Sequence, residues 1–185
     1  MSAESEKIKG GDVKKAVIMG VGAKQGLGSQ LAKRIASEGL HVFVASRTQS
    51  RLDALTVEIE QAGGGATAVC ADATNEEQVI KLFEKAGSGL DLAIYNTGNN
   101  FPGQIIDMDA EYFLKSWESC CFGGFLFGRE AVRHMVKSGR GLCYSLVQAL
   151  HCGGGPILVP SIPQRQDYAH LLRQWPRKMV QREFM

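Results

Sequence analysis

Residues 16–28 read AVIMGVGAKQGLG, an apolar run that passes directly into a loop of closely spaced glycines. A continuous apolar run that ends in glycine is typical of a strand buried on both faces of a parallel sheet. Residues 27–39, LGSQLAKRIASEG, then carry apolar side chains at helical spacing and stop at a glycine. The stretch therefore predicts a buried strand, a glycine loop and a helix in direct succession.

The same alternation of strand and helix continues to about residue 147. Further strands are expected at 41–47, 66–72, 90–96 and 141–147, and helices at 51–63, 75–87 and 109–137. Short apolar strands that alternate with amphipathic helices indicate an α/β fold, a Rossmann-type doubly wound parallel sheet of about five strands. We expect an N-terminal arm at 1–12, this domain at 13–147, and a segment at 148–185 that departs from the pattern.

Composition excludes several classes of protein. With 185 residues, 44% of them hydrophobic, the chain can bury a sizeable core. Its apolar runs are far shorter than a bilayer span, and the start MSAESEKIKGGDVKK lacks the apolar middle of a signal peptide. A net charge of +2 predicts no nucleic-acid partner, and the five cysteines form no C-x-x-C pair for a metal. We expect a cytoplasmic protein with no membrane segment and no metal site.

The loop at residues 20–28, GVGAKQGLG, is the first candidate site. Glycines 22, 26 and 28 would let the backbone turn tightly, approach a pyrophosphate and begin a helix whose amides face the anion. The Walker pattern fails because Gln25 follows Lys24, and the G-x-G-x-x-G spacing fails because Gln25 stands where the third glycine belongs. A phosphate cradle is the favoured interpretation, and an ordinary glycine turn is the alternative.

Three motifs in order resemble the short-chain dehydrogenase/reductase family over about residues 13–141. They are Gly22-x-x-x-Gly26-x-Gly28 after the first strand, CADATNEEQV after the third and YNTGN after the fourth. The resemblance implies a Rossmann fold and hydride transfer between a nicotinamide cofactor and a small carbonyl or alcohol. It also implies cofactor contacts in the first loop from Gly22, Lys24, Gly26, Leu27 and Gly28, and in the later motifs from Asp72, Ala73, Asn96 and Gly98. The helix at 109–137 is a candidate surface for a homo-oligomer.

The choice between the two nicotinamide cofactors can be argued from charge. A dinucleotide fold that prefers NAD places an acid after the second strand to accept hydrogen bonds from the ribose 2′-hydroxyl. This chain has Arg47 there, and Lys24 supplies a second cation in the glycine loop. Two cations would attract a 2′-phosphate, so NADP is expected in preference to NAD. The alternative is that both side chains are ordinary solvated charges.

The catalytic half of the family pattern is missing. Members carry a tyrosine followed four residues later by a lysine, which together exchange a proton as hydride moves. Four positions beyond Tyr95, Tyr112, Tyr144 and Tyr168 stand Asn99, Ser116, Gln148 and Leu172. Cys120 occupies the place of the family's water-holding asparagine, and a buried core thiol is the favoured interpretation of it. We therefore assign no catalytic residue.

A shift of reading frame from about residue 142 is one explanation of this break. Read in a neighbouring frame, LVQALHCGG at 146–154 can encode a serine segment like the family's, and KMVQREFM at 178–185 can encode the lead into its sixth strand. In that register the codon of Ser161 can give phenylalanine but never tyrosine. Without the family's remaining elements, the fifth strand would be an uncovered edge and the long helix would expose Phe122, Phe125 and Phe127.

Three hypotheses about function follow. The first is an NADP-dependent oxidoreductase of the short-chain type, which predicts turnover. The second is a protein or subunit that holds NADP without catalysis, which predicts affinity alone. The third is a truncated or misread inactive product, which predicts low stability and aggregation through exposed edges.

Overall fold

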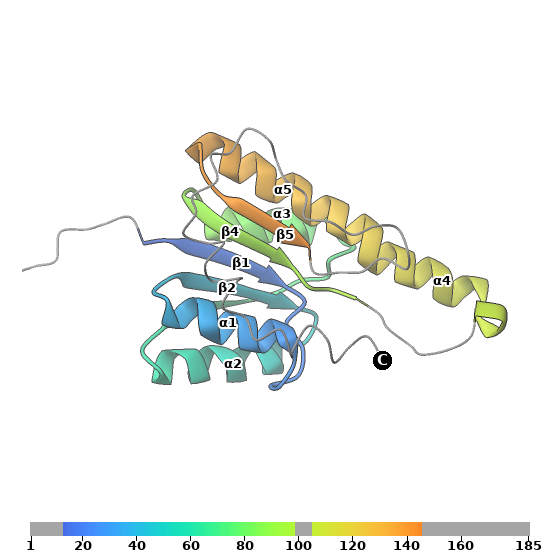
Figure 1. The fold of residues 1–185 in the computed structure, drawn as a ribbon, viewed down its shortest axis with the longest axis horizontal. Coiled ribbons are helices and arrows are strands. Elements are labelled where there is room, and N and C mark those ends of the chain that lie inside the picture. Colours follow the sequence, from blue (N-terminus) through green and yellow to red (C-terminus); the bar gives the residue numbers. More distant parts are fainter. Residues whose placement is uncertain (1–12, 99–104, 146–185) are drawn as a thin grey trace, which may run out of the picture.

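The computed structural model describes residues 13–98 and 105–145 (Figure 1). The expected arm at 1–12 and the segment at 148–185 lie outside these residues, as do the last two positions of the domain expected at 13–147. The proposed frame-shifted stretches lie outside them too.

One parallel sheet of five strands forms the centre of the fold. The strands are β1 (Lys15–Met19), β2 (His41–Ser46), β3 (Gly65–Cys70), β4 (Leu90–Tyr95) and β5 (Leu142–Ser145). They lie in the order β3-β2-β1-β4-β5, and every neighbouring pair is parallel. The predicted α/β Rossmann-type sheet of about five strands is confirmed. The chain runs outward from β1 to β3 and then crosses to β4 on the other side of β1, which creates a topological switch point.

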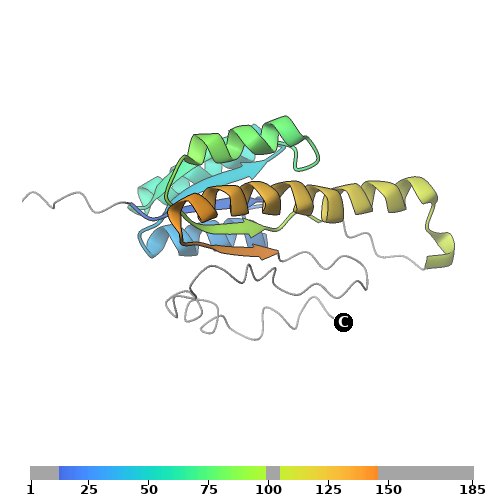
Figure 2. The same ribbon diagram turned by 90° about the horizontal axis from the view of Figure 1, so that it is seen from above.

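Helices cover both faces of this sheet. Helices α1 (Leu27–Ser37) and α2 (Gln49–Gln61) lie on one face, and α3 (Glu76–Ala86) and α5 (Gly123–Ser138) lie on the other (Figures 1 and 2). Successive side chains of a strand point to opposite faces, so β1 must be apolar at every core position. Its Ala16 and Ile18 pack with α1 and α2, whereas Val17 and Met19 pack with α3 and α5.

Local sequence sets the ends of the helices. The side chain of Asn75 caps α3 by accepting a hydrogen bond from the Gln78 amide, and two glutamates in the first turn favour the positive end of the helix. The same helix ends at Gly87, whose φ of +71° is available to glycine and strained for other residues. Strand β1 likewise ends before a glycine, because Gly20 at φ +93° turns the chain out of the sheet.

The predicted helix at 109–137 is present but interrupted. A 3-10 turn at Ile105–Asp107 precedes α4 (Ala110–Trp117), a π-helical turn at Glu118–Phe122 follows α4, and α5 continues from there. A π turn holds an extra residue and rotates the helical face that follows it. Phe122 and Phe125 are exposed by 38% and 58%, as expected.

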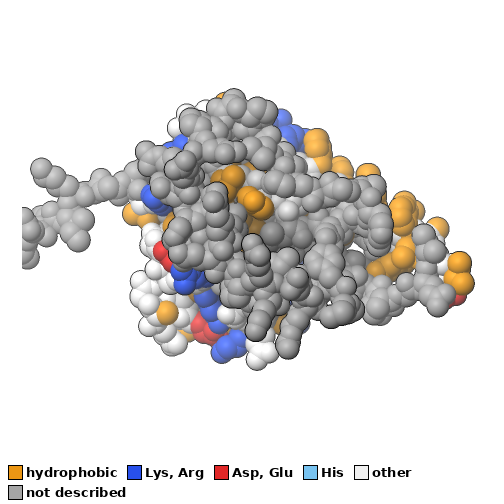
Figure 3. Space-filling view, viewed as in Figure 1, with side chains coloured by type: hydrophobic (Ala, Val, Ile, Leu, Met, Phe, Trp, Pro, Cys, Tyr) orange, Lys and Arg blue, Asp and Glu red, His pale blue; other side chains and the backbone are white. Residues whose placement is uncertain are grey.

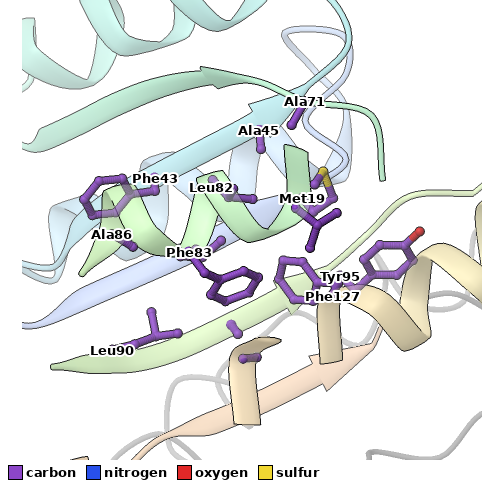
Figure 4. Close-up of a cluster of buried hydrophobic side chains, with 14 of the residues drawn as sticks. Met19, Phe43, Ala45, Ala71, Leu82, Phe83, Ala86, Leu90, Tyr95 and Phe127 are labelled. Atoms are coloured by element: carbon purple, nitrogen blue, oxygen red, sulfur yellow. The ribbon is translucent and has the colours of Figure 1, made fainter. Parts of the chain in front are cut away.

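The expectation that Phe127 is exposed is wrong. Phe127 is fully buried and packs edge-on against Phe83, at 5.0 Å between ring centroids, and against Tyr95 at 5.4 Å (Figure 4). It follows Phe125 by two residues, about 200° further around the helix, and therefore lies on the face that α5 turns toward the sheet. Aromatic pairs at such distances stabilise a core beyond their buried area.

Candidate cofactor-binding site

Every candidate site residue lies at one edge of the sheet. The four strands β1 to β4 are parallel, so the loops that follow them meet where the strands end. The glycine loop follows β1, Arg47 follows β2, Asp72 and Ala73 follow β3, and Asn96 and Gly98 follow β4. The structure thus gathers all the predicted residues along the carboxyl ends of adjacent strands, beside the switch point between β1 and β4.

The glycine loop is pinned to β2 and folded on itself. The amides of Gly20 and Val21 both donate to the Ala45 carbonyl, at 2.9 and 3.2 Å. Within the loop, the Ala23 carbonyl accepts from the Gly26 amide at 2.8 Å and from the Ser29 hydroxyl at 2.9 Å. These bonds fix a tight turn immediately before α1.

Two glycines in this region are required by close packing. A Cβ at Gly20 would lie 2.5 Å from the Asn96 carbonyl group, and one at Gly28 would lie 2.6 Å from the Gly20 carbonyl oxygen. Such contacts are closer than a real Cβ atom makes, so only glycine fits without a shift of the backbone. Gly20 opens the candidate loop but was not among the glycines expected to contact the cofactor, although the spacing Gly20-x-Gly22 was a usable signal.

Gly22 differs, because a Cβ there would meet no atom within 4 Å. Its lack of a side chain leaves open space in front of the loop. The adjoining N-cap of α1, Gly26, makes no side-chain capping bond, and the first turn of α1 contains no acidic residue. The first amides of a helix need acceptors and carry partial positive charge, so an anion fits here. The loop has the shape and polarity that a dinucleotide pyrophosphate requires.

Asn96 ties the end of β4 to the glycine loop. Its backbone amide donates to the Met19 carbonyl at 2.8 Å, and its side-chain Nδ2 donates to the Gly20 carbonyl at 3.0 Å. One residue therefore spans the switch point and holds the loop after β1 against β4.

Asp72 shapes the loop between β3 and α3. Its Oδ1 accepts from the Thr74 amide at 2.9 Å and from the Thr74 hydroxyl at 2.8 Å, and its own amide donates to Gln78 Oε1 at 2.7 Å. Ala73 beside it is buried. This carboxylate stabilises the turn that connects β3 to α3.

The two predicted cations have different surroundings. Arg47 is exposed at the end of β2, and its carbonyl accepts a weak bond from the Cys70 thiol at 3.6 Å. Lys24 is also exposed, by 74% of its side chain, but its Nζ lies 2.7 Å from Glu58 Oε1 on α2. Sequence spacing gave no sign of this pair, because the register of α2 against the loop is set by tertiary packing.

A small cavity of about 140 Å³ opens beside the loop. Four of its residues come from the loop and the start of α1, and four from α2: Gly22, Ala23, Lys24, Ser29, Arg51, Ala54, Leu55 and Glu58. Arg51, in the first turn of α2 and four residues after Arg47, is a further cation that was not expected from the sequence. Of the two cations expected from the sequence, Lys24 lines this cavity and Arg47 does not.

The π-helical turn contacts the end of β4 through Tyr95. Tyr95 is buried, burial raises its pKa, and its hydroxyl donates to the Ser119 carbonyl. This phenol is therefore held protonated and engaged with the backbone. Cys120 is only partly buried, which differs from the buried core thiol expected from the sequence. Across residues 13–98 and 105–145, no cluster of His, Cys, Asp and Glu side chains could hold a metal ion.

Comparisons with known proteins agree with this geometry. The family profile described as short chain dehydrogenase matches residues 15–144. Elsinochrome reductase 1 of Elsinoe fawcettii is 32% identical over 133 residues, which are 70% of this chain and 49% of that protein. The chain spans about half the length of the curated relatives it matches.

Solved structures of short-chain dehydrogenases are similar to this chain as well. A short-chain dehydrogenase from Rhodopseudomonas palustris is 34% identical, with a TM-score of 0.66 over 71% of this chain and 62% of that one. A variant of actinorhodin polyketide ketoreductase, solved with NADPH, is 26% identical, with a TM-score of 0.66 over 72% of this chain and 52% of that one. No helix in the described part of the chain is long and apolar enough to cross a membrane.

Proposed function

Because the chain belongs to the short chain dehydrogenase family of oxidoreductases, we propose that it binds NADP(H) at the carboxyl edge of β1 to β4 and serves the reduction of a small carbonyl compound or the oxidation of an alcohol. The observation that carries this proposal is the open space at Gly22 in front of an uncapped helix N-terminus. Pyrophosphate would occupy that space and accept bonds from the first amides of α1. The loops that follow β3 and β4, which contain Asp72 and Asn96, would enclose the rest of the nucleotide.

The preference for NADP over NAD rests on charge at the end of β2. Arg47 stands there in place of an acid, and Arg51 lies one turn further on in the wall of the cavity. A guanidinium offers paired donors that match phosphate oxygens, whereas the NAD ribose presents only hydroxyls. We therefore assign the 2′-phosphate of the cofactor to this corner of the site.

Titration of the 185-residue chain with NADPH and NADH tests the proposal. Gly22→Val should abolish measurable affinity for both cofactors, because its side chain would fill the space that the pyrophosphate needs. Gly128→Val on α5 is the matched control, since a Cβ there also meets no atom within 4 Å and the residue is far along the chain from the loop. Unchanged NADPH affinity in Gly22→Val would overturn the site.

Arg47→Ala tests the cofactor preference separately. A hydrogen bond to a charged group contributes about 1.5–3 kcal/mol, so NADPH affinity should fall about 10- to 100-fold. NADH affinity should change less than threefold, because NADH has no 2′-phosphate. Equal losses for both cofactors, measured by calorimetry, would assign Arg47 to the fold rather than to the phosphate.

A second candidate function is cofactor binding without turnover. It is favoured by the absence of a Tyr-x-x-x-Lys pair from the 185 residues. Loss of nicotinamide absorbance, followed with NADPH and a panel of ketones and aldehydes, separates the two functions. Saturable NADPH binding with no such loss supports binding alone, whereas turnover supports the oxidoreductase.

We also propose that a second copy of the chain binds along α4. Hydrophobic side chains gather along α4 and the start of α5 at the right of Figure 3, where Phe113, Leu114 and Trp117 are each exposed by about half. Glu111 and Lys115 form an ion pair on the same helix, at 2.5 Å. A twofold antiparallel pairing of α4 would place each carboxylate near the lysine of the other copy. Trp117→Glu should convert a dimer to a monomer in light scattering, and a monomeric wild type would refute the pairing.

A further inference from the structure

Glu58 on α2 forms ion pairs with the glycine loop and with α1. Its Oε1 lies 2.7 Å from Lys24 Nζ in the loop, and its Oε2 lies 2.5 Å from Lys33 Nζ on α1. Lys, Arg, Asp and Glu side chains gather over α1 and α2 at the lower left of Figure 3. One carboxylate is therefore shared between a lysine that belongs to the candidate site and a lysine that does not.

The position of Glu58 brings this carboxylate to the cofactor. It lines the same cavity as Gly22, Ala23 and Lys24. The ammonium groups of Lys24 and Lys33 lower its pKa, so Glu58 is ionised at neutral pH. A fixed negative charge thus stands at the rim of a site that we assign to an anionic ligand.

We infer that Glu58 tunes the preference for NADP by competing with the 2′-phosphate for Lys24. The inference rests on the proposed function, because it needs a phosphate at this corner. NADPH would draw Lys24 away from Glu58, whereas NADH would leave the pair intact. Glu58 would therefore reduce the affinity for the phosphorylated cofactor alone.

Two features make this exchange easy. Lys24 is mostly exposed, and an exposed ion pair contributes little to stability, so its release requires little free energy. Lys33 is more enclosed, with 28% of its side chain exposed, and it remains bonded to Glu58 when Lys24 leaves. The carboxylate is consequently never left without a cation.

Five proteins test the inference by calorimetry at low, constant salt. They are wild type, Glu58→Gln, Lys33→Gln, Lys24→Gln and the double variant that combines Lys24→Gln with Glu58→Gln, for which Lys24→Gln is the reference. Glu58→Gln frees Lys24 and should raise NADPH affinity about two- to fivefold, the range that an exposed ion pair allows. Lys33→Gln leaves Glu58 with Lys24 as its one remaining lysine, tightens that pair and should lower NADPH affinity by a similar factor. NADH affinity should stay within twofold throughout.

The possible outcomes distinguish a failure of this inference from a failure of the proposed NADP(H)-binding function. A folded wild type that binds neither cofactor overturns the proposed function and the inference together. A wild type that prefers NADPH, with Glu58→Gln and Lys33→Gln unchanged from it, overturns the inference alone. If Glu58→Gln raises affinity equally in the Lys24→Gln background, Glu58 acts by direct repulsion of the phosphate and competition for Lys24 is refuted. Circular dichroism of each variant confirms that it is folded.

Discussion

The glycine loop allows the same methyl group to be added at two nearby points with opposite consequences. In Gly28→Ala, the new Cβ would lie 2.6 Å from the Gly20 carbonyl oxygen and 2.9 Å from Asn96 Nδ2. The methyl group would push apart the two atoms of a hydrogen bond that joins β4 to the loop. In Gly22→Ala, the new Cβ would meet nothing within 4 Å.

The free energies of these effects can be combined. Overpacking in a close contact costs about 1–3 kcal/mol, and loss of the Asn96 hydrogen bond costs about 0.5–1.5 kcal/mol. Replacing glycine with alanine in a helix returns about 0.5–1 kcal/mol. Gly28→Ala should therefore lower the free energy of unfolding by about 2 kcal/mol. Gly22→Ala should leave it unchanged or raise it by up to about 1 kcal/mol, because Gly22 does not have a positive φ.

Thermal and urea unfolding, followed by far-ultraviolet circular dichroism, measure the difference. For a chain of this size 1 kcal/mol moves Tm by about 2–4 °C, so Gly28→Ala should melt about 5–10 °C below Gly22→Ala. The comparison cancels the entropy that any glycine substitution removes from the unfolded chain. If the two variants melt within about 1 °C of each other, the close approach of α1, the loop and β4 is wrong.

Three further predictions concern the rest of the fold. Burial, and after it the charge of Lys15, holds the pKa of His41 in the folded protein below its usual range. The contribution of neutral His41 to stability is therefore complete above the ordinary histidine pKa and is lost as pH falls through the pKa of the folded state. Between about pH 7.5 and 5.5 the Tm of His41→Gln should fall less than that of wild type, and an equal fall in both proteins would refute this. Burial raises the pKa of Cys143 to about 11, so mass spectrometry at neutral pH should show iodoacetamide on exposed Cys70 well before Cys143, whose early labelling would contradict its burial. Phe127→Ala should lower the free energy of unfolding in urea by about 3–5 kcal/mol, whereas Phe125→Ala should cost less than about 1 kcal/mol, and similar losses would refute the packing of α5.

The fold could be predicted well from the sequence because the apolar pattern of each strand and helix follows which of its faces are buried. A strand such as β1, which is covered on both faces, must be apolar throughout. A helix such as α3 begins and ends at residues typical of helix caps, Asn75 and Gly87. These are local signals, and they located all the strands and helices of the sheet within a few residues. The doubly wound parallel sheet followed from the alternation of strands and helices, whereas the strand order β3-β2-β1-β4-β5 comes from the structure.

The parts that sequence reasoning missed depend on contacts between distant residues. The π-helical turn at Glu118–Phe122, which the sequence did not predict, lies between α4 and α5. Within α5, Phe127 faces the core and Phe125 faces outward, because residues two positions apart in an α-helix lie about 200° apart around its axis. The pairing of Lys24 with Glu58 joins residues on two elements whose relative placement is a property of the packed fold. Charge alone identified Lys24 as a candidate, but only the structure showed that Glu58 pairs with it.

The strand order affects how the chain can fold while it is being synthesised on the ribosome. β1, β2 and β3 are made first and lie side by side, but β4, the second neighbour of β1, is made only after α3. The nascent chain therefore presents the open edge of β1, and its face toward α5 stays uncovered for longer still. An open edge with apolar faces is a template for pairing with another chain and a natural target for chaperones. The strand at the centre of the finished sheet is thus among the first to be synthesised and among the last to be protected.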